Sequence, residues 1–295
     1  MRLLAPLAIL VLGNATEAYL KELWVPLSGA IAQQRKVETI ANNVANANTN
    51  GFKKDQVAFK EHLTAYEHGA DIDLPNKEWA PKDFYRSYGA EKALVEVQGT
   101  YTDFSQGQIK PTNNPLDLAL NGKGFLEVLT PGGTRYTRNG TLGVNNLGQL
   151  VTQHGYPVLT KLNIPEGFDP KSSDQALPNP KDRFVQLGKG AISINHQGQL
   201  FQNNQLISEL SVTEFKTMEN LKKEGNSMFI NDDIKNIKKD NKTMVIQGSV
   251  EVSNVNPIKE MSNLIKAHRN FESIQKVIKT YDSMAAKAYN EIGKF

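Results

Sequence analysis

The sequence predicts an α+β fold, in which long N- and C-terminal helices flank a central, hairpin-rich all-β domain. Near each end of the chain, apolar residues recur at alternating spacings of three and four, which is typical of helices that bury one face. Between about 90 and 250 the pattern changes to short alternating runs separated by turn dipeptides, which indicates hairpins. A chain of 295 residues is also too long for one small core, which favours more than one domain.

The N-terminal helical pattern begins at residue 20 and has one polar member, Gln34. We expect it to be interrupted near Pro26 and to end in the Asn-rich stretch 42–51, because Asn and Gly tolerate positive φ and let the chain turn. The residues at this spacing are Leu20, Leu23, Leu27, Ala30, Gln34, Val37, Ala41 and Val44.

The C-terminal pattern is more regular. Asn256-Pro257 marks its start, because proline fits the first turn of a helix, and no proline or glycine interrupts 258–292. A helix over that range would be roughly 50 Å long. The residues at this spacing are Leu264, Ala267, Phe271, Ile274, Ile278, Tyr281, Ala285, Ala288 and Ile292. Spacing alone leaves three arrangements open: an intramolecular helical hairpin, a dimeric coiled coil, and a wall shared by many subunits.

The middle of the chain alternates apolar and polar residues, as in 116–120, and is punctuated by turns such as Asn121-Gly122 and Asn139-Gly140. Residues 144–151 and 194–201 are similar in sequence, which predicts two similar hairpins 50 residues apart rather than a duplicated domain.

The predicted organisation has five consecutive parts. The first is ambiguous: Met1-Arg2 followed by apolar residues 3–12 is typical of a secretory signal, whereas Pro6 argues against a long stable helix there. The alternatives to a secretory signal are an apolar tail that packs elsewhere and a start codon assigned too early. The parts are an apolar extension or signal-like segment (1–19), an N-terminal helical segment (20–61), an extended connector (62–90), a central β-rich domain (91–250) and a C-terminal helical segment (251–295).

Composition excludes several functions. The net charge of +3 gives no electrostatic case for nucleic acid, and the absence of cysteine removes disulfides and thiol chemistry. His62 and His68 lie near acidic residues, but their spacing fits no established metal site. Gly122-Lys123-Gly124 lacks the context of a phosphate loop. We therefore expect no catalytic residue, no cofactor, no metal and no small-molecule substrate, and the chain is not predicted to be an enzyme.

Several short blocks of sequence carry a family resemblance, and their residues are Asn42, Asn43, Asn46, Gly51, Phe52, Gly122, Gly124, Phe125, Tyr136, Arg138, Gly148, Ser253, Asn254, Arg269 and Glu272. In this order along the chain, the blocks resemble the rod and hook axial proteins of the bacterial flagellum. The first is similar to that family's Ala-Asn-Asn-x-Ala-Asn block followed by Thr-x-Gly-Phe-Lys, and the later ones to its Gly-x-Gly-Phe, Tyr-Thr-Arg-x-Gly and Gly-x-Leu-Val segments. Near the C-terminus, His268 departs from the glutamine usual in Ala-Gln-Arg-x-(Tyr/Phe)-Glu.

The resemblance implies a structural subunit of the flagellar basal-body rod, the periplasm-spanning shaft that transmits motor torque to the hook and is required for swimming. It implies that the terminal helices pair in a coiled-coil-like layer and that the partners are copies of the chain, other rod and hook proteins and the flagellar export apparatus. Export by that type III apparatus involves no cleaved signal, in conflict with the signal-like residues 1–15. The region 55–115 does not closely follow the distal rod pattern, which favours the proximal type.

We expect the assembly interface of such a subunit to lie along the two helical seams. A secreted or periplasmic β-rich binding protein with a coiled-coil tail is the alternative, which a true signal peptide would favour. The predicted interface residues are Leu23, Leu27, Val37, Ala41, Val44, Leu264, Phe271, Ile274, Ile278, Tyr281 and Ile292.

Overall fold

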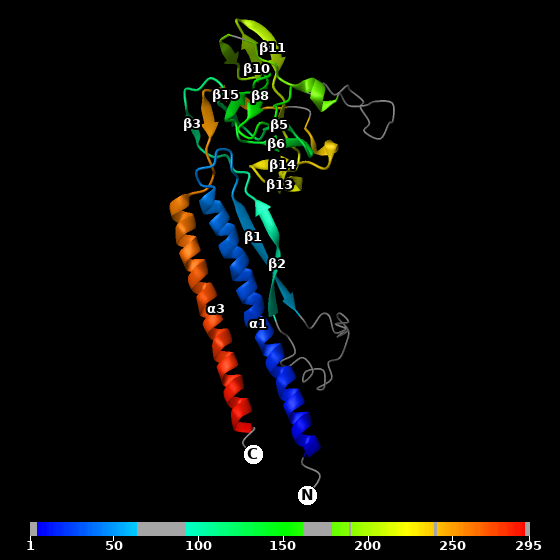
Figure 1. The fold of residues 1–295 in the computed structure, drawn as a ribbon, viewed down its shortest axis with the longest axis vertical. Coiled ribbons are helices and arrows are strands. Elements are labelled where there is room, and N and C mark those ends of the chain that lie inside the picture. The colour runs from blue at the N-terminus through cyan, green and yellow to red at the C-terminus, as the bar shows by residue number, and fades with distance from the viewer. Residues whose placement is uncertain (1–4, 64–92, 162–178, 189, 239–240, 293–295) are drawn as a thin grey trace, which may run out of the picture. The chain divides into compact units, whose positions relative to one another are not determined.

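A computed structural model describes residues 5–63, 93–161, 179–188, 190–238 and 241–292. It has a long helix near each end and β-strands between them, so the predicted α+β class is confirmed (Figure 1). No helix in these described ranges is long and apolar enough to cross a membrane.

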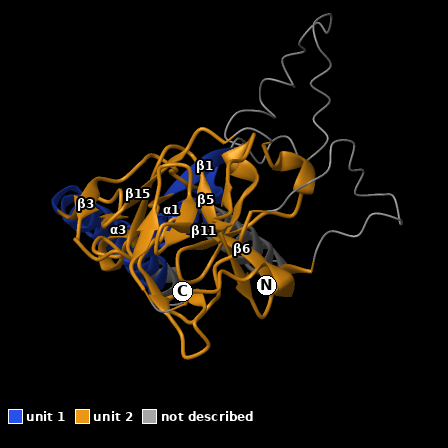
Figure 2. Ribbon diagram, turned by 90° about the horizontal axis from the view of Figure 1, so that it is seen from above, with its two compact units in different colours: residues 1–42, 56–101, 258–295 blue, residues 43–55, 102–257 orange. Residues whose placement is uncertain are grey.

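The chain divides into two compact units (Figure 2). The helical unit comprises residues 1–42, 56–101 and 258–295, and the β unit comprises residues 43–55 and 102–257. The two units therefore interleave along the chain. The five parts expected from the sequence follow one another along the chain, whereas each compact unit combines segments that are not consecutive. The division into five parts stays a prediction.

Helix α1 spans Ala5–Ala45 and helix α3 spans Pro257–Ile292. Helix α1 ends within the Asn-rich stretch and α3 begins at its proline, as predicted. The expected interruption near Pro26 is wrong, because α1 runs through it, and the argument from Pro6 against a long helix near the N-terminus is wrong too, because α1 begins at Ala5. A proline lacks the backbone N–H and so removes one hydrogen bond of the helix. The turns before and after Pro26 keep their backbone N–H donors, so the helix continues through this position.

The helical unit also contains a β-ribbon; its residues 93–102 lie in the region predicted to be β-rich, but its residues 55–63 begin in the expected helical segment. Strands β1 (Asp55–Leu63) and β2 (Ala93–Thr102) pair with each other, so the last part of the expected helical segment is a strand. Most of the expected connector lies outside the described residues. The ribbon contacts α1, since the Val95 N–H donates to the Ser28 hydroxyl at 3.2 Å. One residue further along α1, a methyl group placed on Gly29 would lie 3.8 Å from Cδ1 of Ile274 in α3.

The described part of the β unit has no α-helix between residues 102 and 256, and its strand pairings are antiparallel. Its sheets have the orders β12-β5-β6-β14-β13, β11-β10-β9, β15-β4, β16-β3 and β7-β8. The strands are β3 (Ile109–Pro111), β4 (Leu118–Asn121), β5 (Phe125–Thr130), β6 (Gly133–Thr137), β7 (Leu142–Val144), β8 (Leu150–Thr152), β9 (Ile192–Ile194), β10 (Gln199–Gln202), β11 (Gln205–Glu209), β12 (Val212–Thr213), β13 (Lys222–Glu224), β14 (Met228–Ile230), β15 (Met244–Gln247) and β16 (Ser249–Glu251). Short 3-10 turns lie at Pro180–Arg183, Met218–Asn220 and Ile234–Asn236.

Two apolar clusters form the core of the β unit. The larger is aliphatic and is built from residues such as Leu118, Leu126 and Leu200, each fully buried. The smaller is aromatic and centres on Phe125, which is packed between Phe215 and Phe229 with ring centroids 5.6 and 5.5 Å away. Both clusters use residues from well-separated parts of the chain, so the β unit forms only when distant hairpins meet.

The two similar sequence segments form two similar hairpins, β7–β8 and β9–β10. In each, an Asn side chain shapes the turn: Asn145 Oδ1 accepts from the N–H groups of Leu147 and Gln149, and Asn195 Oδ1 accepts from those of Gln197 and Gln199. The fourth turn residue is a glycine at positive φ in both, Gly148 at 76° and Gly198 at 81°. The shared turn explains the similarity over eight residues.

Candidate assembly site

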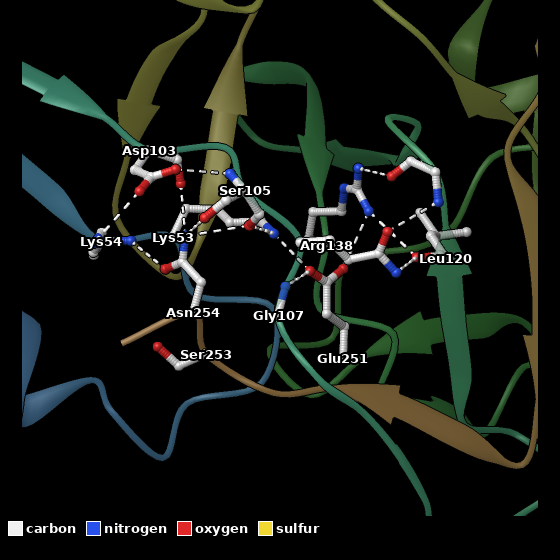
Figure 3. Close-up of polar contacts among 12 residues, drawn as sticks. Lys53, Lys54, Asp103, Ser105, Gly107, Leu120, Arg138, Glu251, Ser253 and Asn254 are labelled. Atoms are coloured by element: carbon white, nitrogen blue, oxygen red, sulfur yellow. Dashed lines mark hydrogen bonds and ion pairs between the residues drawn. The ribbon is translucent and has the colours of Figure 1, made fainter. Parts of the chain in front are cut away.

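Three charged side chains meet in the interior of the β unit, and we call them the clasp: Lys53, Arg138 and Glu251 (Figure 3). Lys53 follows the Asn-rich loop, Arg138 follows β6, and Glu251 ends β16. Their side chains are at most 2% exposed. The ammonium group of Lys53 donates to Glu251 Oε1 at 2.5 Å, and the Arg138 guanidinium donates to Glu251 Oε2 at 3.1 Å.

Backbone groups bind further polar atoms of the clasp, although Arg138 Nε is buried without a hydrogen bond. Lys53 Nζ also donates to the Ser105 carbonyl at 2.8 Å, and Arg138 Nη2 donates to the Gly122 carbonyl at 2.6 Å. Glu251 Oε1 accepts a further bond from the Gly107 N–H at 2.8 Å. The Arg138 guanidinium lies 4.9 Å from the centre of the Phe125 ring, so an aromatic face covers it. A buried ion pair needs such additional bonds, because its desolvation costs several kcal/mol per ion.

The clasp holds two cations around one carboxylate. Burial lowers the pKa of Lys53, while the negative charge and hydrogen bond of Glu251 act in the opposite direction. Burial likewise lowers the pKa of Arg138, again opposed by Glu251. Glu251 is therefore the group on which both buried cations depend.

The glycine of the Thr-x-Gly-Phe-Lys block is required by the backbone beside the clasp. Gly51 has φ of +68°, and its N–H donates to the Glu251 carbonyl at 2.7 Å. A Cβ at this position would lie 2.4 Å from the carbonyl carbon of Arg138. Only glycine combines this φ with so close an approach of two backbone segments.

Replacing Gly51 by alanine should lower the free energy of unfolding by about 2–5 kcal/mol, because left-handed strain is joined by a backbone overlap. Gly155 is the matched control: it has φ of +81°, and a methyl group placed on it meets nothing within 4 Å. Gly155→Ala should cost about 1–2 kcal/mol, from strain alone. Urea unfolding of the two variants measures the difference, and equal losses would contradict this account.

Asparagines of the family blocks bind backbone groups around the clasp. Asn254 Oδ1 accepts from the Lys54 N–H at 2.8 Å, and its amide donates to the Asp103 carbonyl at 2.8 Å. Asn43 makes a reciprocal pair of bonds with the backbone of Asp55, at 2.8 and 2.9 Å. These amides close the Asn-rich loop on itself and fasten the segment before α3 to the segment after α1.

Other polar groups of these blocks also form local hydrogen bonds. Asn46 Oδ1 accepts from the Thr49 hydroxyl at 3.2 Å, and Ser253 Oγ accepts from the Val255 N–H at 3.2 Å. Asn42 is exposed.

Phe52 is buried under Lys223. Lys223 Nζ lies 4.0 Å from the centre of the Phe52 ring and donates to the Lys53 carbonyl at 2.7 Å and to Asp55 Oδ2 at 2.8 Å. Lys223 therefore belongs to the supporting layer of the clasp, whereas its neighbour Lys222 makes an exposed ion pair with Asp232.

The Gly-x-Gly-Phe segment packs on Thr243. The Gly124 N–H donates to the Thr243 hydroxyl at 2.7 Å, and that hydroxyl donates to Glu214 at 2.8 Å. A Cβ on Gly122 would lie 2.7 Å from the same hydroxyl oxygen. The segment is a turn between β4 and β5, but these strands pair with β15 and with β6 and β12 and not with each other, so the predicted hairpin is wrong here. The Gly122 carbonyl is an acceptor for Arg138.

Tyr136 belongs to the aromatic cluster, with its ring centroid 4.9 Å from that of Phe215 in an edge-on arrangement. Burial raises the pKa of Tyr136 well above its usual value. Sequence reasoning identified Arg138 and Tyr136 but missed Glu251, Asp55 and Lys223. No pattern in the neighbouring sequence marks these three residues, because their main partners lie far away along the chain.

The predicted seam residues of α3 are its less exposed positions. Phe271 and Ile278 are half-buried, and so are Leu264, Ile274 and Tyr281, while most other positions between 261 and 287 are exposed. The structure describes the backbone of Ile292 but not its side chain. Two other family positions on α3, Arg269 and Glu272, are exposed; Glu272 Oε1 lies 3.2 Å from Nδ1 of His268.

On α1 the burial follows the predicted spacing at Ala30 but departs from it at other positions. Leu23, Val37 and Val44 are half-buried, but Leu27 and Ala41 are exposed. The most buried positions of its helical-unit part are Ala30, Ala32 and Ile40. Ala32 lies one turn after Ser28, which bonds to the β1–β2 ribbon, so the ribbon accounts for part of this departure. Whether the seam residues meet another subunit stays a prediction.

Within the described residues there is no group of His, Asp and Glu side chains that could hold a metal ion. The segment around His62 and His68 lies outside the described side chains.

Three family models match the chain, and each contributes one residue of the clasp. "Flagella basal body rod protein" matches residues 25–53, which end at Lys53; "Flagellar hook protein FlgE/F/G D1 domain" matches 119–202, with Arg138; and "Flagellar basal body rod FlgEFG protein C-terminal" matches 246–291, with Glu251.

Curated relatives align over nearly their whole length. A flagellar basal-body rod protein FlgG from Buchnera aphidicola subsp. Schizaphis graminum is 31% identical over 90% of this chain and 97% of the relative. A FlgF from Mesorhizobium japonicum is 30% identical over 92% and 97%, and a FlgG from Borreliella burgdorferi is 30% identical over 92% and 98%.

The fold, the three clasp segments and these matches define an axial structural protein of the bacterial flagellum. The chain belongs to the flagellar basal-body rod protein family, and it is a structural subunit located in the basal-body rod. Relatives with both the FlgG and the FlgF name match at similar identity, so the preference for the proximal type stays a prediction.

Proposed function

We propose that this rod subunit polymerises through α1 and α3, in a coiled-coil-like layer, into the tubular shaft that carries motor torque to the hook. Its partners in this proposal are further copies of the chain and other rod and hook proteins, and the flagellar export apparatus delivers it. The role is mechanical and not enzymatic.

One observation carries the proposal: both helices expose large apolar side chains in the single chain. On α1, Trp24 and Ile31 are 59% and 53% exposed; on α3, Ile258 and Ile265 are 78% and 56% exposed. Exposed apolar stripes of this kind mark surfaces that another protein covers. The family matches include both terminal segments, and they therefore favour the rod subunit over the alternative of a secreted binding protein.

Assembly through unlike surfaces accounts for an open tube. When one face of a subunit binds a different face of the next, repetition by a screw operation gives a filament and not a closed ring. Long helices packed side by side then resist shear, because close-packed interiors are not easily deformed. The burial of apolar stripes offsets the entropy lost when the helices become ordered in the filament.

Hydrogen exchange tests this proposal. In a verified monomer, amides of α3 should exchange rapidly, because their apolar face lacks its cover, and in assembled rods they should become protected. Strands β5 and β6 of the five-stranded sheet are the internal control and should be protected in both states. Strong protection throughout 258–292 in the monomer would contradict the proposal.

A further inference from the structure

The β unit is connected to the rest of the chain through four ends. It comprises residues 43–55 and 102–257, so its two segments begin and end at four boundaries. Helix α1 enters at the first end, β1 leaves from the second, β2 leads into the third, and α3 follows the fourth. Every covalent connection between the β unit and the helical unit therefore passes through one of these ends.

Asp55, at the second end, is bonded to the first and the third. Asn43 Nδ2 donates to the Asp55 carbonyl at 2.8 Å, and Asn43 Oδ1 accepts from the Asp55 N–H at 2.9 Å. The Thr102 hydroxyl donates to Asp55 Oδ1 at 2.8 Å. The other carboxylate oxygen of Asp55, Oδ2, accepts from the Lys223 ammonium group at 2.8 Å, which attaches these three ends to β13.

Asn254 attaches the fourth end to the same group of residues. Its Oδ1 accepts from the Lys54 N–H and its Nδ2 donates to the Asp103 carbonyl, both at 2.8 Å. The Asp103 N–H donates in turn to the Lys54 carbonyl at 2.9 Å. Because their side chains bond the four ends to one another, we call the following residues the collar: Asn43, Asp55, Thr102 and Asn254.

We propose that Asp55 makes the four ends of the β unit open only together, so that force arriving along one connection is shared by all of them. Hydrogen bonds that belong to one network support one another, and segments joined in this way open as one cooperative unit. The side chains of Asp55 and Lys223 are each 21% exposed, so their ion pair is largely shielded from water. Burial lowers the pKa of Lys223, and the hydrogen bond and charge of Asp55 oppose that change.

The inference rests on the proposed function and adds a mechanical detail to it. A subunit that carries torque has to pass force between its two units without losing one connection at a time. Four ends that open independently would be peeled away singly, whereas four ends bonded through one residue have to be released in a single step.

Hydrogen exchange of the full chain, followed by NMR, tests the coupling. The N–H groups of Lys54 and Asp103 are bonded to other residues and not to the Asp55 side chain. Asp55→Asn keeps the size of that side chain but removes the charge that holds Lys223, and it should accelerate the exchange of both N–H groups by about ten- to a hundredfold. Unchanged exchange of these two N–H groups, with acceleration only at position 55, would overturn the inference.

Asp232→Asn is the matched control, since Asp232 pairs with Lys222, the neighbour of Lys223 on β13, at 2.7 Å and lies outside the collar. It should leave the exchange at both positions unchanged. The amides of β5 and β6 should stay protected in both variants, which shows that the β unit is folded. If Asp55→Asn does not fold, Thr102→Val takes its place, because it removes one hydroxyl at nearly constant size; it should accelerate the same two N–H groups, and unchanged rates would contradict the coupling.

Rotation under load connects the collar to the rod. Cells with Asp55→Asn should build rods in normal number and turn a small attached bead at normal speed, but with a large bead they should lose speed relative to cells with Asp232→Asn. Equal speeds at high load, or the absence of rods from Asp55→Asn cells, would overturn the inference. Exchange of α3 tests the proposed function separately, so a failure of the collar can be told from a failure of helical assembly.

Discussion

Replacing Glu251 by glutamine should lower the free energy of unfolding by about 3–5 kcal/mol. The substitution keeps the size and shape of the side chain but removes the one carboxylate between Lys53 and Arg138. Both cations would then be buried without a counter-ion, and desolvation already lowers the pKa of each. An unpaired buried charge is among the few changes that destabilise a protein by this much.

The measurement is urea unfolding of the full chain, and Glu209→Gln is its control. Glu209 pairs with Lys161 at 2.6 Å, but the two side chains are 34% and 57% exposed, so its loss should cost under about 1 kcal/mol. If the Glu251 variant lost no more stability than the Glu209 variant, the clasp would not be a stabilising element. Removing a buried cation together with the carboxylate, in Lys53→Met/Glu251→Gln, should recover part of the loss, because the two sites are coupled.

The clasp has a consequence for the whole subunit. Lys53 lies shortly after α1 in the chain and Glu251 lies shortly before α3, and the Gly51 N–H joins the two segments directly through the Glu251 carbonyl at 2.7 Å. The chain therefore enters the β unit after α1 and leaves it before α3 through segments bonded to each other. If the two helices become ordered only on assembly, the bonds between the segment after α1 and the segment before α3 can still be present in the free subunit, because all clasp residues belong to the β unit.

Local signals explain which features the sequence predicted. The extent of α3 follows from the 3-4 spacing and from Asn256-Pro257, which are properties of neighbouring residues. The twin turns follow from Asn145 and Asn195, whose side chains bond within four residues. By contrast, Glu251 contacts Lys53 across 198 positions and Arg138 across 113, and no single-chain pattern records such pairs.

Strand β1 and its pairing with β2 were missed for a related reason. Strand β1, Asp55–Leu63, is a short run of mixed character directly after a turn, and its partner begins only at Ala93. Without the ribbon, the face of α1 that includes Ala32 could not be recognised as buried. The family resemblance identified Arg138 and Asn254 as motif residues, but their physical role required the structure.

Replacing Phe271 by aspartate should abolish rod assembly while leaving the β unit folded. Phe271 is a half-buried member of the α3 seam, as is Ile278 one heptad further on, for which we expect the same result. An ionised carboxylate at either position would have to be desolvated in the helical layer, which the surrounding apolar side chains cannot offset. The aromatic core around Phe125 belongs to the other unit and should be unaffected.

Ser273→Asp is the matched control, because it adds the same charge to the same helix at an exposed position outside the seam. Electron microscopy of purified basal bodies should show rods with the Ser273 variant and none with the Phe271 or Ile278 variants, and swimming in soft agar should follow the same order. The unfolding of the β unit in urea should be unchanged in all three, which separates failed assembly from failed folding. Normal motility of a chain with both Phe271→Asp and Ile278→Asp would show that the seam is not the surface through which the rod is built.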